Sequence, residues 1–219
     1  MSSETKSVEV QAPARKKWTL EIAGAAIFIA LSAVVSALIT PILPRVPLWG
    51  IAIFDPISLI WITCFLIFGW RSGFLCLAGG SLILFFFDPT GGIGPFFKFF
   101  ATLPFILIPT IVYFLGKKKG KTETPMHTWI FNVKNYSLTM IMAYGLRIVL
   151  MLLCNYLIFS TLFAGVVQYV DLSFFGLPQV KAWDAIIWMT ILINSWQTVF
   201  DVVVPYVITF KTVPKYMVI

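Results

Sequence analysis

The chain has 219 residues, of which 59% are hydrophobic and only 11% are charged, and its mean hydropathy is +0.93. A soluble domain usually has about a quarter of its residues charged, so this composition excludes an ordinary soluble protein and predicts a chain embedded in a lipid bilayer. The net charge of +7 could indicate nucleic-acid binding in a soluble protein. Here the basic residues lie between apolar runs, which favours a membrane-topology signal, and we expect no nucleic-acid partner.

Residues 1–17 mix charged residues with Ser, Pro and Gln and have no apolar stripe. They are predicted to form a disordered cytoplasmic arm. Residues 18–219 are predicted to form a single membrane domain, which opens with an uncharged run over residues 22–44. At about 1.5 Å per helical residue, this run is long enough to cross a hydrocarbon core of about 30 Å.

Five further apolar segments complete a predicted all-α bundle of six transmembrane helices. They extend over residues 56–70, 73–87, 94–115, 136–163 and 182–210, and the segments between them carry Pro, Gly or clustered charge. The second and third helices are short for membrane spans, so we expect them to stand upright or to be shielded by neighbours.

The basic residues divide unequally between the two sides of such a bundle. One side receives Arg15, Lys16, Lys17, Arg71, Lys117, Lys118, Lys119, Lys121, Lys134, Lys211 and Lys215, and the other receives Arg45, Lys98 and Lys181. Because cytoplasmic loops carry the excess of Lys and Arg, both termini are predicted to be cytoplasmic, in a multi-pass protein of the plasma membrane.

Small residues line one face of the first predicted helix. Ala26, Ala30, Ala33 and Ala37 follow at spacings of four, three and four, so their side chains share one side of the helix. Such a face lets another helix backbone approach closely. The pattern is equally consistent with packing inside this bundle and with docking to a second membrane protein.

Polar residues follow one face of each of the last two predicted helices. The sixth helix carries Trp183, Thr190, Asn194, Gln197 and Asp201 in this register, and the fifth carries Tyr144, Arg147, Met151 and Asn155. A polar group at membrane depth is costly, so each must face protein, water or a ligand.

These residues divide into two predicted roles. Arg147 and Asp201 lie at similar predicted depth, and we expect them to form a structural ion pair. Asn155, Asn194 and Gln197 lie nearer the outer side, and amides can bind a polar heterocycle without the desolvation cost of a charge. We expect them to contact a ligand, with interhelical hydrogen bonding as the alternative. Trp183 could cover that ligand, although an interfacial anchor is the commoner role.

Enzyme chemistry is poorly supported by the sequence. His127 is the only histidine and lies in a predicted cytoplasmic loop, and the three cysteines lie in apolar runs. The basic segment that begins at Gly116 is one residue short of a phosphate-binding loop and follows a predicted membrane helix. We therefore expect no catalytic site, no metal and no cofactor.

Several of these segments together resemble the substrate-binding S-components of energy-coupling factor (ECF) vitamin transporters. The resemblance rests on the alanine face, Ile53-Phe54-Asp55-Pro56-Ile57, the turn over residues 68–73, Arg147 followed by Asn155-Tyr156, and Ile193-Asn194-Ser195-Trp196-Gln197 running into residues 201–206. It implies that the chain captures a vitamin from outside, under a loop between the first two helices that contains Trp49 and Asp55. It also implies docking, through the alanine face, to a membrane T-component driven by two cytoplasmic ATPases.

Among these S-components, the last two segments are most similar to the riboflavin-specific members. Asn155 and Asn194 match two positions that the family places against the flavin, whereas Gln197 stands where those members have Lys. The resemblance therefore implies riboflavin as the transported ligand. The alternative is a standalone secondary carrier or channel for a small polar solute, in which Arg147 and Asp201 would form a gating or proton-relay pair.

Overall fold

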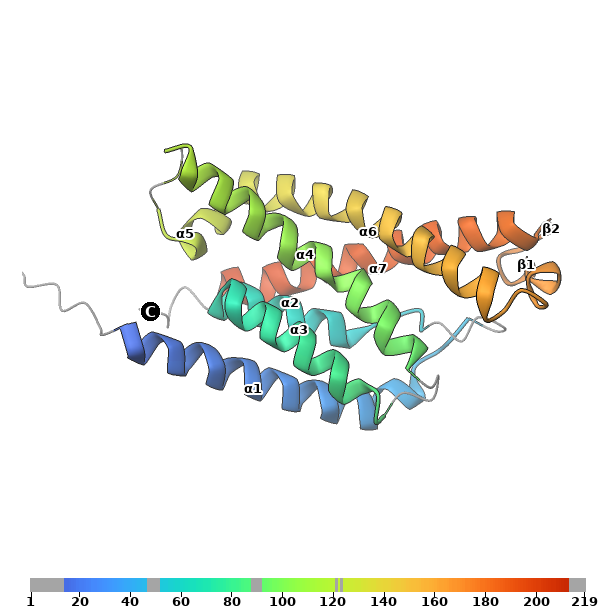
Figure 1. Ribbon diagram of the computed structural model, residues 1–219, viewed down its shortest axis with the longest axis horizontal. Helices are drawn as coiled ribbons and strands as arrows, with labels where there is room; N and C mark the ends of the chain where they lie inside the picture. Colours follow the sequence, from blue (N-terminus) through green and yellow to red (C-terminus); the bar gives the residue numbers. More distant parts are fainter. Residues whose placement is uncertain (1–13, 47–51, 88–91, 121, 123, 213–219) are drawn as a thin grey trace, which may run out of the picture.

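The computed structural model describes residues 14–46, 52–87, 92–120, 122 and 124–212, and these residues form seven α-helices and one small sheet (Figure 1). In chain order the elements are α1 (Ala14–Leu38), the 3-10 turn η1 (Thr40–Ile42), α2 (Pro56–Phe68), α3 (Trp70–Leu84), α4 (Ile93–Lys118), α5 (Met126–Ile130), α6 (Val133–Thr161), the 3-10 turn η2 (Val167–Tyr169), β1 (Asp171–Leu172), the 3-10 turn η3 (Ser173–Phe175), β2 (Leu177–Lys181) and α7 (Ala182–Thr212).

The predicted all-α membrane character is confirmed, because α1, α4, α6 and α7 are long and apolar enough to cross a membrane. The helices α2 and α3 have 13 and 15 residues and are shorter than a usual span, so the count of six spans stays a prediction. Since α1 begins at Ala14, the last four residues of the predicted arm 1–17 are helical, and residues 1–13 lie outside the described part.

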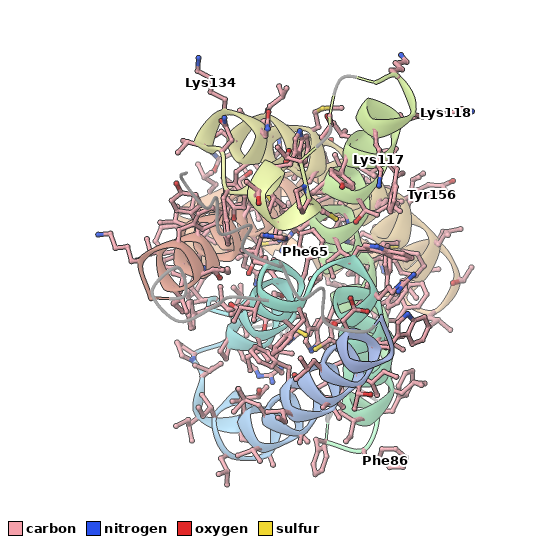
Figure 2. The ribbon with its side chains drawn as sticks, turned by 90° about the vertical axis from the view of Figure 1, so that its left-hand side faces the viewer. Phe65, Phe86, Lys117, Lys118, Lys134 and Tyr156 are labelled. Carbon is pink, nitrogen blue, oxygen red and sulfur yellow. The ribbon has the colours of Figure 1, made fainter. Side chains whose placement is uncertain are left out.

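The helices alternate in direction along the long axis of the molecule (Figure 1). Helices α1, α3 and α6 run toward the end that holds β1 and β2, and α2, α4 and α7 run back. The start of α1, the short α5 and the end of α7 therefore share the opposite end. Figure 2 looks onto this end, where Lys118 and Lys134 project away from the bundle.

Local sequence explains why α2 and α3 form a tight helical hairpin. Asp55 caps α2 by accepting a hydrogen bond from the Ile57 amide at 3.0 Å, and Pro56 occupies the first helical position, where no amide donor is needed. Gly69 lies between the two helices with φ of +91°, a conformation that L side chains rarely adopt. A capped start and a glycine turn therefore fix the hairpin on which α1 packs.

The buried face of α1 differs from its alanine face. Ala25, Ser32 and Ser36 are buried against α2 and α3, and the indole of Trp61 donates a hydrogen bond to Ser32 Oγ at 2.9 Å. The serines of α1 therefore face the bundle.

Cysteine labelling tests the predicted orientation in the membrane. In intact cells, a membrane-impermeant thiol reagent should modify Gln168→Cys, in the exposed segment before β1, and should modify Lys118→Cys only after permeabilisation. The native Cys64, Cys76 and Cys154 are buried, so the background should be low. Labelling of Lys118→Cys in intact cells would indicate the opposite orientation in the membrane.

Candidate functional site

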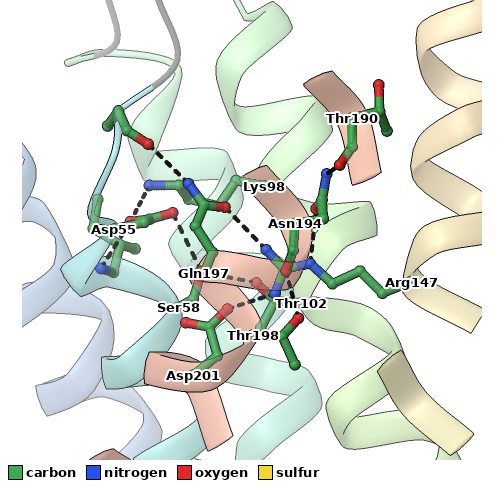
Figure 3. A network of polar contacts seen from close by, with 12 residues as sticks. Asp55, Ser58, Lys98, Thr102, Arg147, Thr190, Asn194, Gln197, Thr198 and Asp201 are labelled. Atoms are coloured by element: carbon green, nitrogen blue, oxygen red, sulfur yellow. Dashed lines mark hydrogen bonds and ion pairs between the residues drawn. The ribbon is translucent and has the colours of Figure 1, made fainter. Parts of the chain in front are cut away.

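Arg147, on α6, is the centre of a buried polar network (Figure 3). Its Nε donates to Asn194 Oδ1 at 2.8 Å and its Nη2 to Gln197 Oε1 at 3.0 Å. Its Nη1 forms an ion pair with Asp201 Oδ2 at 2.5 Å, and both charged residues are 1% exposed. The three acceptors lie on one side of α7 because their spacings of three and four residues match the helical turn. One guanidinium can therefore bind all three, since its donors form a rigid fork.

The two amides of this network use their nitrogen atoms as well as their oxygen atoms. Asn194 Nδ2 donates to the Thr190 carbonyl at 2.8 Å, within α7. Gln197 Nε2 donates to the carbonyl of Ala52 at 2.8 Å, in the segment that precedes α2. Gln197 therefore links Arg147 of α6 to a loop that is distant in the sequence.

A second ion pair joins the start of α2 to α4. Lys98 Nζ lies 2.6 Å from Asp55 Oδ1, and both side chains are largely buried. Ser58 Oγ donates to Asp55 Oδ2 at 3.3 Å, and Thr102 Oγ1 donates to Ser58 Oγ at 3.2 Å. Asp55 thus caps α2 and pairs with Lys98, which gives it a structural role.

An open apolar cavity of about 520 Å³ lies between α7 and two loops. It uses the same stretch of α7 as the polar network but a different face of the helix, on which Leu192, Trp196 and Val199 are 41%, 51% and 58% exposed. The loop before α2 contributes Val46 and Ile53, the turn η3 contributes Phe174 and Phe175, and α7 contributes Leu192, Ile193, Ser195, Trp196 and Val199. The hydroxyl of Ser195 is hydrogen-bonded to the hydroxyl of Tyr144 on α6 at 2.7 Å. The cavity therefore offers mainly apolar and aromatic surface, with one hydroxyl in its wall.

A local carboxylate stabilises the turn that presents Phe174 and Phe175. Asp171 Oδ1 accepts hydrogen bonds from the hydroxyl of Ser173 at 2.6 Å and from the Ser173 amide at 2.9 Å. These bonds favour the charged form and hold the pKa of Asp171 below its usual value, the hydroxyl having the larger effect.

Those predicted ligand residues that the structure describes lie outside the wall of this cavity. Asn194 and Gln197 bind Arg147, and Asp55 pairs with Lys98, as described above. Trp49 lies outside the described residues. The structure also joins Asn194 and Gln197, predicted as ligand contacts, to the ion pair predicted as structural, in one network.

The other two predicted ligand residues lie on or beside the C-terminal part of α6. Asn155 is buried and donates to the Met151 carbonyl at 2.9 Å, and no hydrogen bond between described residues joins it to the Arg147 network. Trp183 packs against the ring of Tyr156 at 5.4 Å, and Tyr156 is 59% exposed. That contact favours the anchoring role for Trp183. A role of these residues in binding stays a prediction.

The aromatic residues of the cavity were missed by reasoning from the sequence. Phe174, Phe175 and Trp196 are apolar residues in an apolar chain, so a search for polar groups at membrane depth passes over them. One signal was available, because Trp196 lies between Asn194 and Gln197 in the sequence.

The alanine face of α1 lies on the surface of the described chain. Ala26, Ala30 and Ala37 are exposed and Ala33 is partly buried. The bundle packs instead against the face that carries Ser32 and Ser36, so the alanine face is available to another membrane helix.

Comparison with known proteins gives a family match. The family model described as "ECF transporter, substrate-specific component" matches residues 20–209. No curated protein and no solved structure gives a significant match. The matched range includes every described residue of the Arg147 network and of the cavity wall.

Proposed function

The chain belongs to the family of ECF transporter substrate-specific components, and from this premise we propose that it captures riboflavin, or a closely similar vitamin, from the outer side of the membrane. Members of this family are transporter components, and the family is not an enzyme family. Membership implies a small-molecule substrate. It also implies that the chain functions together with a membrane T-component and ATPases. Together with the four apolar helices, it also confirms the predicted location as a multi-pass protein of the plasma membrane.

The apolar cavity beside α7 is the observation that carries the choice of substrate class. Its volume of about 520 Å³ suits a small molecule, since such sites usually measure roughly 300–1,000 Å³. Phe174, Phe175 and Trp196 supply aromatic surface for the flat faces of a fused ring system. A small, strongly charged solute would gain little binding free energy from apolar walls. A flavin ring would gain more, because burying its apolar surface is favourable.

The cavity wall is almost wholly apolar, so the polar edge of the ligand needs hydrogen-bonding groups from elsewhere in the bundle. We propose Asn155 and Asn194 for this role, as the resemblance to riboflavin-specific members implies. The carbonyl oxygen of Asn155 accepts no hydrogen bond from the described residues, and that of Asn194 has a second lone pair beyond its bond to Arg147. Ser195 lies in the cavity wall, but its hydroxyl already bonds the Ile191 carbonyl and the Tyr144 hydroxyl.

Arg147 and Asp201 support this site without contacting the ligand. Their charges neutralise each other, and together with Asn194 and Gln197 they join α6 to α7. A standalone carrier would use such a pair for gating, but the family assignment favours a static scaffold inside one subunit of a larger transporter. We propose that loading ends with transfer of the vitamin through the T-component, driven by the ATPases.

Riboflavin titration of the purified protein tests this function, with quenching of riboflavin fluorescence as the signal. The unmodified chain should bind at micromolar concentration or tighter. Asn155→Ala should weaken binding on the order of 5- to 150-fold, because Asn155 is buried and a lost hydrogen bond to a buried group costs roughly 1–3 kcal/mol.

Asn135→Ala is the matched control for this titration. Asn135 also lies on α6, but near its other end, and donates to the Trp129 carbonyl at 3.0 Å. Its loss should leave riboflavin affinity unchanged. Equal weakening by both substitutions would contradict a ligand contact at Asn155.

A further inference from the structure

The loop before α2 has a base in which its two ends are held together. Arg45 and Ala52 pair in an antiparallel bridge, and the Ile53 amide donates to the Pro44 carbonyl at 3.0 Å. Val46 and Ile53, one from each end, line the apolar cavity. The position of this base therefore sets one wall of the cavity.

Three side-chain contacts tie the base of the loop to the helices. Asp55 pairs with Lys98 of α4, and Phe54 packs edge-on against Phe200 of α7 with ring centroids 5.3 Å apart. The third contact is the hydrogen bond from Gln197 Nε2 to the Ala52 carbonyl. This bond reaches the bridge itself, through the backbone of Ala52.

The oxygen of the Gln197 side-chain amide is hydrogen-bonded within the network, and this bond fixes the direction in which the amide nitrogen donates. Gln197 Oε1 accepts from Arg147, whose guanidinium is in turn held by Asp201 and Asn194. Because an amide is planar, fixing the oxygen directs the NH₂ group to the opposite side, where Ala52 lies.

We propose that Gln197 is a positioning residue. Through its bond to the Ala52 carbonyl it fixes the position of the cavity wall formed by Val46 and Ile53, and it does not touch the substrate. This inference deepens the proposed function, since it assigns a role to the position at which the riboflavin-specific members have Lys. It requires a side chain that accepts from Arg147 and donates to Ala52 at the same time. Glutamate meets only the first requirement, and methionine meets neither.

Hydrogen–deuterium exchange of the purified, ligand-free protein tests the role of Gln197. The readout is the exchange rate of the Ile53 amide, together with the melting temperature. Gln197→Glu keeps the acceptor for Arg147 and removes the donor to Ala52. Asn194→Asp is the matched control, because it keeps the other acceptor for Arg147 and removes a donor only to Thr190 within α7.

Gln197→Glu and Gln197→Met should both speed exchange at Ile53 by about fivefold, the factor expected when one hydrogen bond of ordinary strength is lost. Asn194→Asp should leave the Ile53 exchange rate unchanged. Unchanged exchange in Gln197→Glu would overturn the proposal. So would equal acceleration in Asn194→Asp, because that would indicate a general loosening of α7.

This test is independent of the substrate assignment because it uses no ligand. Riboflavin titration of the same purified proteins reports on the proposed function separately. If Ile53 exchange responds as expected but no flavin binds, the positioning role stands and the vitamin is a different one.

Discussion

Replacing Arg147 by methionine should lower the free energy of unfolding by about 3–5 kcal/mol, because it leaves a buried carboxylate without its partner. The change removes the only cation that contacts the buried carboxylate of Asp201 among the described residues. It also takes the hydrogen-bond donor from the side-chain carbonyl groups of Asn194 and Gln197. Thermal unfolding in detergent, followed by circular dichroism, measures the loss.

Two further variants separate charge from geometry at this site. The double substitution Arg147→Met with Asp201→Leu should recover most of the lost stability, because removing both charges leaves no unpaired charge in the bundle. Arg147→Lys should recover less, since an ammonium is a point charge and does not reproduce a fork that binds three acceptors. If Arg147→Met unfolds at the same temperature as the unmodified chain, Arg147 is not the centre of the bundle's polar core.

Placing a tryptophan on the alanine face should abolish vitamin uptake while leaving ligand binding intact. Ala30 is exposed on α1, and a bulky ring there would prevent close approach of a helix from the T-component. The ring would point away from the α2–α3 side and from the cavity, so folding and affinity should be preserved. Uptake by cells that produce the T-component and the ATPases, compared with riboflavin titration of the isolated protein, measures both quantities.

Leu31→Trp provides the matched control for the alanine face. Leu31 is 44% exposed and apolar, and as the next residue along it lies about 100° around the helix from Ala30. Uptake should survive this substitution. Loss of folding and binding together in Ala30→Trp would indicate instead that the alanine face packs inside the bundle.

The long helices of the fold could be predicted from the sequence because hydrophobic length is a strong signal in a bilayer. Each of α1, α4, α6 and α7 contains a long apolar run that is interrupted by few charges. The spacing of Asn194, Gln197 and Asp201 also showed correctly that they share one face of α7. The pairing of β1 with β2 was not predicted, because the two strands are short and their sequence has no clear alternation.

The candidate site was harder to predict because it depends on which groups meet between helices. The positions of Arg147 and Asp201 along their helices predicted that the two residues lie at similar depth. They could not show that the same guanidinium also binds Asn194 and Gln197, since that depends on the rotation of both helices. The contact between Gln197 and Ala52 joins segments 145 residues apart, and no local pattern encodes it. The cavity depends on two loops that meet at α7, so its wall could not be read from any single segment.

Native mass spectrometry of the purified chain with an equimolar mixture of vitamins tests the central claim most directly, because the substrate competes with alternatives of similar size. A substrate-specific subunit with a flavin site should retain one riboflavin per chain, and Asn155→Ala should retain less. Retention of a different vitamin, with no flavin adduct, would contradict the riboflavin assignment and identify the true substrate. A spectrum with no retained vitamin at all would contradict the capture role proposed for the isolated chain.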